Sequence, residues 1–317
     1  MILGADIGGT AVKFVLRAPG GEAALREEVP TDPQSPRLTL QRLADRLAAL
    51  GYAPDAVTAV GLACAGIVSP AGGRLGRAPN LPGWEHTSLA EPLRAVFGDR
   101  PAAFANDVNA ALVGESRLGA GRGARDVVML ALGTGVGGAV MVAGRLVTGA
   151  HDGAGEIGHM VVDPEGPVCT CGNRGCLEAF AGARALTAAA RRRARSAAAG
   201  AGLRRLVRER GEQLSPRDLA AAAADGDPDA REIYALAGDR LGLAVGNLIN
   251  VLDPERVVIG GGVARAGALI LDPCRRRAVT VVLGEHGRRT PIVPAELGPW
   301  AAALGAALLA EERERPT

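Results

Sequence analysis

Three glycine-rich clusters, each directly after a stretch that reads as a β-strand, constrain this chain more than any other feature. They are Asp6-Ile-Gly-Gly-Thr10, Gly133-Thr-Gly-Val-Gly-Gly138 and Gly260-Gly-Gly262. Phosphate oxygens need closely placed backbone N–H donors, and a Cβ atom would block that approach. A single cluster of this kind is better explained as a tight turn. Three of them at strand ends favour loops that hold phosphate.

The middle cluster matches the G-x-G-x-x-G pattern of dinucleotide-binding folds at Gly133, Gly135 and Gly138. That pattern requires a helix directly afterwards. Residues 139–142 and 146–147 are instead apolar and β-like, so we predict a β-hairpin here and reject a Rossmann site. The first cluster is also flanked by strands on both sides, and the sequence contains no G-x-x-x-x-G-K-[ST] motif, which argues against a P-loop.

Strands and helices alternate along the chain. Apolar runs predict strands at 2–7, 11–16, 56–62, 102–105, 126–132, 139–142 and 256–259. Helical spacing predicts helices at 36–50, 108–118, 177–210, 228–252 and 301–313. This alternation predicts an α/β protein. A chain of 317 residues is long for one hydrophobic core, so two domains are expected.

Charge and hydropathy narrow the class of protein further. The net charge of +2 is too small to indicate nucleic acid or a membrane as the main partner. We expect no signal peptide, because the first residues lack a basic region followed by an apolar one, and no transmembrane span, because no run of about 18 apolar residues occurs. A cytoplasmic location is therefore expected, where clustered cysteines bind metal more often than they form disulfides.

A cluster of cysteines near the middle of the chain predicts a metal site. Three thiols lie between residues 169 and 176, and a histidine lies ten residues upstream of the first. Three thiolates and one imidazole suit tetrahedral Zn²⁺ in a closed structural site. The alternative is a loop of unliganded thiols, and the other two cysteines, Cys64 and Cys274, are expected in the core. The candidate ligands are His159, Cys169, Cys171 and Cys176.

Seven motifs, covering nearly the whole chain, resemble those of one known family. They are DIGGT at 6–10, NLPGW at 80–84, NDVNAA at 106–111, LGTGVGGA at 132–139, GEIGH at 155–159, CTCGNRGCLE at 169–178 and VIGGGVA at 258–264. The chain is similar to the ROK family (repressors, open reading frames, kinases) of the actin-like ATPase superfamily, and within it to the glucokinases. The two central motifs are highly specific together.

The resemblance implies a two-domain actin-like ATPase (ribonuclease H-like) fold with an interdomain cleft. Residues 1–115 and 300–317 are expected to form a small α/β domain, and residues 116–299 a larger one that carries the zinc loop. The implied activity is transfer of the γ-phosphoryl group of ATP to a hexose, with glucose as the first expectation and glucose 6-phosphate as the product.

The resemblance also implies roles for individual residues. Asp107 matches the base that takes the proton of the acceptor hydroxyl, and Asp6 matches the residue that holds Mg²⁺, commonly through water. His159 is expected to face the sugar while zinc orients its ring. The implied sugar-binding residues are Asn80, Asn106, Asp107, Glu156, His159 and Glu178. The implied nucleotide-binding residues are Asp6, Gly8, Gly9, Thr10, Lys13, Gly133, Thr134, Gly135, Gly260, Gly261 and Gly262.

Some of these residues have simpler interpretations. Asn106 and Asp107 stand where they would cap the helix that follows, a role compatible with catalysis. Glu156 and Glu178, taken alone, would be surface acids. Lys13 is the only lysine in the chain, and Ala11 stands where the family often carries lysine. Lysines three places after the threonine touch phosphate elsewhere in the superfamily, so Lys13 is either a phosphate ligand or a solvated strand residue.

Other functional alternatives stay open at this point. A kinase for fructose, mannose or an N-acetylhexosamine, a polyphosphate donor and a non-catalytic sugar sensor all fit the same fold. Residues 191–210 hold eight arginines without aromatic neighbours, which favours a solvated helix face or an oligomer edge over a nucleic-acid patch. The family's repressors carry an additional N-terminal helix-turn-helix domain, for which we expect no room before residue 6. The resemblance implies a homodimer or homotetramer.

Overall fold

The computed structural model describes residues 1–78 and 80–314. The chain divides into two compact units, one made of Met1–Gly123, Leu146–Ala154 and Glu296–Thr317, the other of Ala124–Arg145 and Gly155–Ala295. The domain boundaries expected at residues 115 and 300 stay a prediction beside this division. Within the described residues, no helix is both long enough and apolar enough to cross a membrane.

The first unit is built on a mixed sheet in the strand order β3-β2-β1-β4-β5. Its strands are β1 (Ile2–Ile7), β2 (Ala11–Arg17), β3 (Ala23–Pro30), β4 (Ala59–Cys64) and β5 (Ala102–Asn106). β1 and β2 form an antiparallel hairpin, whereas β1, β4 and β5 run parallel. The strand–turn–strand arrangement predicted around Gly8–Thr10 is therefore confirmed, and the carboxyl ends of three strands meet at one edge.

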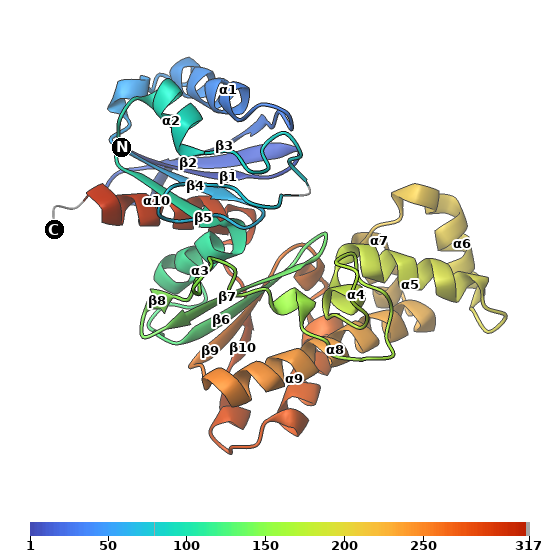
Figure 1. The fold of residues 1–317 in the computed structure, drawn as a ribbon. Helices are drawn as coiled ribbons and strands as arrows, with labels where there is room; N and C mark the ends of the chain where they lie inside the picture. The colour runs from blue at the N-terminus through green and yellow to red at the C-terminus, as the bar shows by residue number, and fades with distance from the viewer. Residues whose placement is uncertain (79, 315–317) are drawn as a thin grey trace. The chain divides into compact units, whose positions relative to one another are not determined.

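Helices cover both faces of this sheet, as Figure 1 shows. The helices of this unit are α1 (Pro36–Ala49), α2 (Ala90–Phe97), α3 (Asp107–Leu118) and α10 (Ala301–Glu314). One core joins Leu3, Ala5 and Ile7 to apolar residues of α1 and α2. On the other face Ile2 packs with Ala303 and Ala307 of α10, which also contacts α3. Alternate residues of one strand thus serve two cores.

The second unit contains a mixed sheet in the order β10-β9-β6-β7-β8. Its strands are β6 (Val127–Leu132), β7 (Val136–Val142), β8 (Arg145–Leu146), β9 (Arg256–Gly260) and β10 (Ile292–Pro294). β6 and β7 form the predicted antiparallel hairpin, and β6, β9 and β10 run parallel. The helices are α4 (Glu178–Ala181), α5 (Ala183–Arg195), α6 (Ala201–Arg210), α7 (Pro216–Ala224), α8 (Pro228–Leu252) and α9 (Ala268–Val281).

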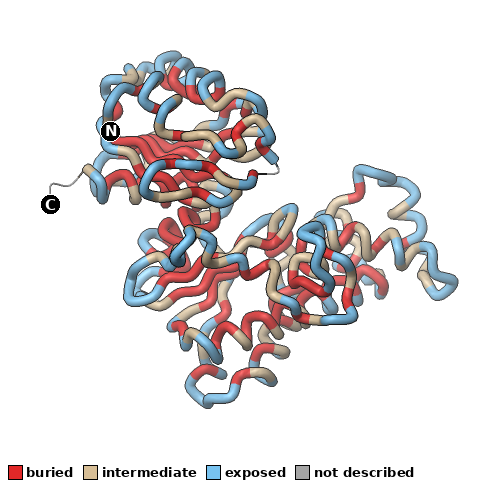
Figure 2. Tube along the Cα trace, in the orientation of Figure 1, coloured by how far each residue is buried: buried red, intermediate tan, exposed pale blue. Residues whose placement is uncertain are grey.

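The core of the second unit lies between its sheet and the long helix α8. Val128, Leu130 and Ile259 from the strands pack in one cluster with Leu241 and Val245 from α8. Figure 2 shows the central strands of each unit as buried, with exposed residues on the outer helices and loops. Short 3₁₀ helices occupy Pro54–Ala56, Ile157–His159, Gly211–Gln213, Val263–Ala266, Gly287–Arg289 and Gly298–Trp300. The α/β class is confirmed.

The arginines of residues 191–210 take part in local contacts. Arg193 pairs with Asp229 at 2.6 Å, and Arg210 pairs with Asp218 at 3.1 Å. Arg204 donates hydrogen bonds to the carbonyls of Ser196 and Ala197, which close the turn between α5 and α6. These contacts fit the interpretation of a solvated helix face.

Candidate active site

The parallel strands of the first unit bring its candidate catalytic residues to one edge. Ile7 of β1 pairs with Cys64 of β4, and Cys64 pairs with Asn106 of β5, so the three strands end in register. Asp6 lies just before the end of β1, and Asp107 begins α3 directly after β5. Ligands of α/β proteins bind at the carboxyl ends of parallel strands. This edge is therefore the candidate site within the first unit.

Asn106 caps α3, as its simpler interpretation expected. Its side-chain oxygen accepts hydrogen bonds from the N–H groups of Val108 at 2.8 Å and Asn109 at 3.2 Å. Its amide nitrogen donates to the carbonyl of Gly66 at 2.9 Å. The adjacent Asp107 carboxylate also accepts from the Val108 N–H at 2.9 Å. The cap fixes the start of α3 and thereby the direction in which Asp107 leaves the sheet edge.

Asp6 and Asp107 interact electrostatically. The pKa of the Asp6 carboxyl is raised from 3.8 to about 7, chiefly by burial and also by the negative charge of Asp107, while Lys13 acts to lower it. Lys13 lies opposite Asp6 in the β1–β2 hairpin. A partly buried pair of carboxylates next to one ammonium is a donor set that suits a divalent cation with several retained waters. The residues present therefore fit Mg²⁺ held through Asp6.

Cys64 lies at the same edge and is fully buried. Burial raises the pKa of its thiol, and the charges of Asp107 and Asp6 add to that effect, so the thiol stays neutral. Cys274, in α9, is equally buried. The prediction that both cysteines belong to the core is confirmed.

The remaining glycine clusters lie together in the second unit. The loop from Gly133 to Gly135 follows β6, and Gly261 follows the neighbouring parallel strand β9. Gly261 has φ of +90°, and a Cβ atom on it would lie 2.4 Å from the carbonyl oxygen of Leu132, so only glycine fits there. Thr134 is exposed at the tip of its loop. Backbone N–H groups of both loops thus border the same strand ends.

The four predicted metal ligands converge in the second unit. One ligand atom from each of His159, Cys169, Cys171 and Cys176 lies within 4.8 Å of the others. The Cys171 and Cys176 sulfurs are 3.7 Å apart, and the Cys169 sulfur is 3.7 Å from Nδ1 of His159. Tetrahedral ligation with Zn–S bonds of about 2.3 Å spaces two sulfurs about 3.8 Å apart. The donor set and its spacing therefore fit Zn²⁺.

His159 connects this cluster to Glu156. While Nδ1 faces the cysteines, Nε2 lies 3.9 Å from a carboxylate oxygen of Glu156. A hydrogen bond from the second nitrogen of a ligating histidine would fix the ring orientation and the tautomer, and 3.9 Å is beyond that distance. The ring thus lies between the candidate metal and a carboxylate that faces Nε2.

Glu178 is tied to two neighbours. Its carboxylate accepts from the Thr170 hydroxyl at 2.7 Å and from the Val136 N–H at 3.1 Å. The Cys169 sulfur lies 3.6 Å from the same carboxylate. Burial raises the pKa of Glu178, but these hydrogen bonds and the nearby His159 outweigh it, so the net pKa is lowered. Glu178 is thus a fixed carboxylate and not a freely solvated surface acid.

The sequence-predicted residues fall into two sets, one in each unit. The first unit carries Asp6, Gly8, Gly9, Thr10, Lys13, Asn80, Asn106 and Asp107. The second carries Gly133, Thr134, Gly135, Glu156, His159, Cys169, Cys171, Cys176, Glu178 and Gly260–Gly262. Sequence reasoning missed Thr170 and also Arg240 of α8, which pairs with Asp163 at 3.0 Å beside the zinc loop and lies over the Phe180 ring. Thr170 lies inside the motif at 169–178, where the pattern marked only the cysteines and the glutamate, and no local sequence pattern marks Arg240.

Two units, each built on a five-stranded mixed sheet with a glycine-rich hairpin, have the architecture of the actin-like ATPase class of nucleotide-binding proteins. The ROK family model matches residues 2–313, and the chain belongs to the ROK family. The resemblance that the motifs indicated is therefore confirmed.

Individual relatives are similar in sequence over nearly the whole chain. A glucokinase of Thermotoga maritima is 33% identical, with 98% of each chain covered. A glucokinase of Streptomyces coelicolor is also 33% identical at the same coverage. The crystal structure of a ROK family glucokinase from Streptomyces griseus, in complex with glucose and AMPPNP, matches with a TM-score of 0.83 and 32% identity, covering 98% of this chain and 99% of that one.

Proposed function

We propose that this chain is an ATP-dependent glucokinase that converts glucose to glucose 6-phosphate. The observation that carries the proposal is the Asp6–Asp107 pair at the carboxyl ends of parallel strands, beside a glycine hairpin with the exposed Thr10 at its turn. The similarity over the full chain to glucokinases, one of them solved with glucose and an ATP analogue, supports this substrate pair.

Asp107 is the proposed general base. The oxygen of the sugar hydroxyl attacks the γ-phosphorus of ATP, its proton passes to the Asp107 carboxylate, and ADP leaves with the electrons of the broken phosphorus–oxygen bond. Phosphoryl transfer depends mainly on positioning and on neutralising charge. Asn106 contributes to positioning, because its cap fixes the first turn of α3 from which Asp107 extends.

The phosphate-binding groups are proposed from all three glycine clusters. Backbone N–H groups of Gly9, Thr10, Thr134 and Gly135 bind phosphate oxygens, helped by Lys13 and the two threonine hydroxyls. The N–H groups of Gly8 and Gly133 instead close their turns on the carbonyls of Ala11 and Gly135. Gly260–Gly262 contact the adenosine. Asp6 would hold Mg²⁺ through water, and that cation would neutralise phosphate charge. Asn80, Glu156, His159 and Glu178 join Asn106 and Asp107 as proposed sugar ligands.

Zinc has a structural role in this proposal. His159, Cys169, Cys171 and Cys176 would hold it, and the site would order the loop that carries Glu178 and orient the His159 ring. The metal would activate no water, since four protein ligands leave no open position. A cytoplasmic location, a homodimeric or homotetrameric assembly and the absence of a nucleic-acid partner complete the proposal.

A coupled assay of ADP release tests the function. Purified protein with Mg²⁺ and ATP is given glucose, fructose, mannose and N-acetylglucosamine in turn, and polyphosphate replaces ATP in a parallel series. We expect the highest kcat/KM with glucose and ATP. A higher kcat/KM with another hexose would reassign the acceptor. Glucose binding by calorimetry without turnover would instead identify a sugar sensor.

A further inference from the structure

The segment from Thr31 to Ser35, between β3 and α1, contacts two separate parts of the first unit's candidate site. We call it the connecting segment. It reaches the glycine hairpin through Thr31 and the 80–84 region through Asp32 and Pro33. None of its residues belongs to a motif of the candidate site.

Thr31 holds the glycine hairpin by two hydrogen bonds. Its hydroxyl donates to the carbonyl of Gly8 at 2.7 Å, and its backbone N–H donates to the carbonyl of Thr10 at 3.0 Å. Thr31 is buried, so water does not readily replace these bonds. Because a carbonyl shares its peptide plane with the next N–H, the first bond fixes the direction of the Gly9 N–H in the turn, and the second fixes that of the Ala11 N–H at the start of β2.

Asp32 and Pro33 hold the 80–84 region. The indole N–H of Trp84 donates to the carbonyl of Asp32 at 2.9 Å, and the backbone N–H of Gly83 donates to the carbonyl of Pro33 at 3.0 Å. The Trp84 side chain is fully buried. These bonds anchor the region that starts with Asn80, the proposed sugar ligand.

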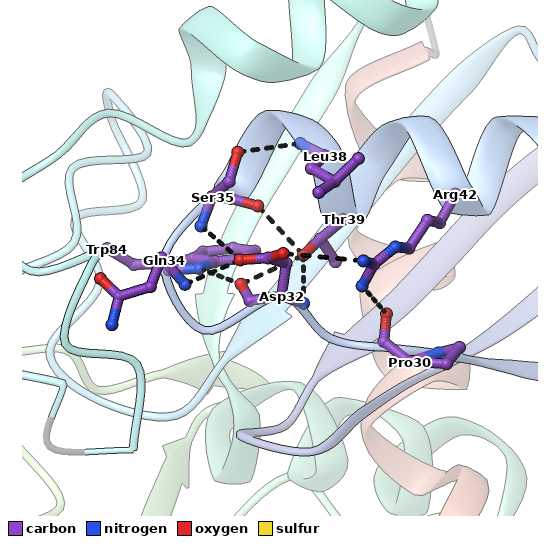
Figure 3. Close-up of polar contacts among 8 residues, drawn as sticks. All are labelled: Pro30, Asp32, Gln34, Ser35, Leu38, Thr39, Arg42 and Trp84. Atoms are coloured by element: carbon purple, nitrogen blue, oxygen red, sulfur yellow. Dashed lines mark hydrogen bonds and ion pairs between the residues drawn. The ribbon is translucent and has the colours of Figure 1, made fainter.

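Asp32 makes several polar contacts within the segment and with α1, as Figure 3 shows. Its carboxylate accepts from the N–H groups of Gln34 and Ser35, each at 3.0 Å, and lies 3.6 Å from Arg42. Its backbone N–H donates at 2.9 Å to the hydroxyl of Thr39, a residue with no solvent exposure. A segment held this firmly transmits a displacement at one end to the other.

The hairpin and the 80–84 region also touch directly. A Cβ atom on Gly9 would lie 2.9 Å from the carbonyl oxygen of Asn80 and 3.0 Å from its Cβ. A shift of either backbone therefore moves the other. The connecting segment and this contact together make one rigid network of the two loops.

We propose that the connecting segment couples nucleotide binding to sugar binding, with Thr31 as a positioning residue for the phosphate-binding hairpin. The proposal rests on the proposed function of the two loops. Ordering of the 80–84 region by glucose presets the hairpin for phosphate, and phosphate bound to the hairpin orders Asn80 in return. Such coupling is reciprocal, so each ligand tightens the other by the same factor.

The test compares four variants of the full chain with the wild type by calorimetry. Glucose affinity is measured with and without the non-hydrolysable analogue AMPPNP, and the ratio of the two Kd values reports the coupling. Thr31→Val removes the hydroxyl and keeps the shape, and Thr31→Ser keeps the hydroxyl. Ser35→Ala removes the cap of α1, which accepts from the Leu38 N–H at 3.2 Å, and leaves both anchoring contacts in place.

In the wild type we expect AMPPNP to tighten glucose binding. Thr31→Val is expected to lower the coupling ratio by about fivefold, or to unity where the wild-type ratio is smaller than that, because one buried hydrogen bond is lost. The same loss is expected to raise the KM for ATP. Thr31→Ser and Ser35→Ala are expected to keep the wild-type ratio, even where Ser35→Ala lowers the melting temperature. Trp84→Phe, which removes the indole N–H donor together with part of a fully buried ring system, is expected to reduce the ratio as well.

A wild-type ratio of one would overturn the proposal, and so would an unchanged ratio and ATP KM in Thr31→Val. A fall in the ratio shared equally by Ser35→Ala would also overturn it, since that would trace the effect to stability. The wild-type ADP-release assay separates this proposal from the proposed function. A wild type without kinase activity refutes the function, whereas an active wild type with no coupling refutes only the role of the connecting segment.

Discussion

The backbone N–H of Val136 donates a hydrogen bond of 3.1 Å to the carboxylate of Glu178, 42 residues further along the chain. Val136 lies within the second glycine cluster, and Glu178 lies two residues after the last candidate zinc ligand. The other carboxylate oxygen accepts from the Thr170 hydroxyl. The zinc loop and the glycine loop are therefore mechanically joined through one carboxylate.

Replacing Glu178 by Gln is expected to weaken the connection between the zinc loop and the glycine loop. The amide retains one acceptor, so either the Val136 N–H or the Thr170 hydroxyl loses its partner. An unsatisfied buried donor costs about 1–3 kcal/mol, and Glu178 is only half-buried, so we expect the lower end of that range. Urea unfolding and the KM for ATP are the measurements. Glu165→Gln, at an exposed position of the same unit, is the control. Equal effects in both variants would contradict the connection of the two loops through Glu178.

Replacing Cys171 by Ser is expected to release zinc. Cys171 is the exposed member of the cluster, so its replacement disturbs packing least while removing one thiolate. The zinc content should fall from about one zinc per chain to well below that. Stability and activity should fall with it, because structural zinc binding contributes to folding. Cys274→Ala, in the core, should lower the melting temperature and keep the zinc. Full activity of metal-free protein supplied with Mg²⁺ would refute the structural role.

Replacing Asp107 by Asn is expected to abolish turnover while glucose still binds. Asn preserves the shape and caps helices as well as Asp, but it cannot accept the hydroxyl proton. Loss of a general base lowers kcat by about 10²–10⁴-fold. A fall in kcat with unchanged glucose affinity marks an interaction made in the transition state. Near-normal kcat, with an unchanged melting temperature, would mean that Asp107 is only part of the helix start.

Asp6 is expected to make stability depend on pH. Because folding raises its pKa from 3.8 to about 7, the folded state keeps a proton that the unfolded state releases. The resulting stabilisation is complete below pH 3.8 and is lost as the pH rises through about 7. In Mg²⁺-free buffer, the melting temperature of Asp6→Asn minus that of the wild type should therefore rise between pH 5 and pH 8, the interval that brackets the folded-state pKa.

Asp107→Asn is the matched control for this titration. Removing the second carboxylate takes away one cause of the raised pKa, so the pH dependence should shrink without disappearing, since burial remains the largest cause. A difference between Asp6→Asn and wild type that is constant across the pH range would show that Asp6 titrates normally.

Sequence reasoning predicted the elements whose patterns are local and complete. The glycine hairpins, the zinc ligands and α8 (Pro228–Leu252) all have signals within one continuous stretch. β3 (Ala23–Pro30) was missed because its inward-facing positions are mostly only half-buried and include Glu27, so the alternation of apolar and polar residues is incomplete. α9 was missed because Pro273 interrupts its pattern. A signal for α7 was present, since Ser215 and Asp218 form a capping box.

The candidate site shows the same division. Asp6 and Asp107 follow strands and belong to motifs, so their neighbourhood could be predicted from strand order. Thr31 and Thr170 act through hydrogen bonds to residues 23 and 8 positions away, and neither contact leaves a periodic pattern. Side chains that position other groups are chosen by three-dimensional proximity, which spacing along the chain does not encode.

The packing of α10 against β1 has a consequence for synthesis on the ribosome. Ile2 and Val15 share a core with Ala303 and Ala307, and Arg17 pairs with Glu311 at 2.5 Å. At translation rates of about 5–20 residues per second, α10 is synthesised on the order of 15–60 s after β1. Throughout that interval the nascent sheet presents an apolar face with no partner from its own chain. The second unit, whose segments all precede residue 296, can complete its core first. The first unit completes its core only after the residues from Glu296 onward have been synthesised.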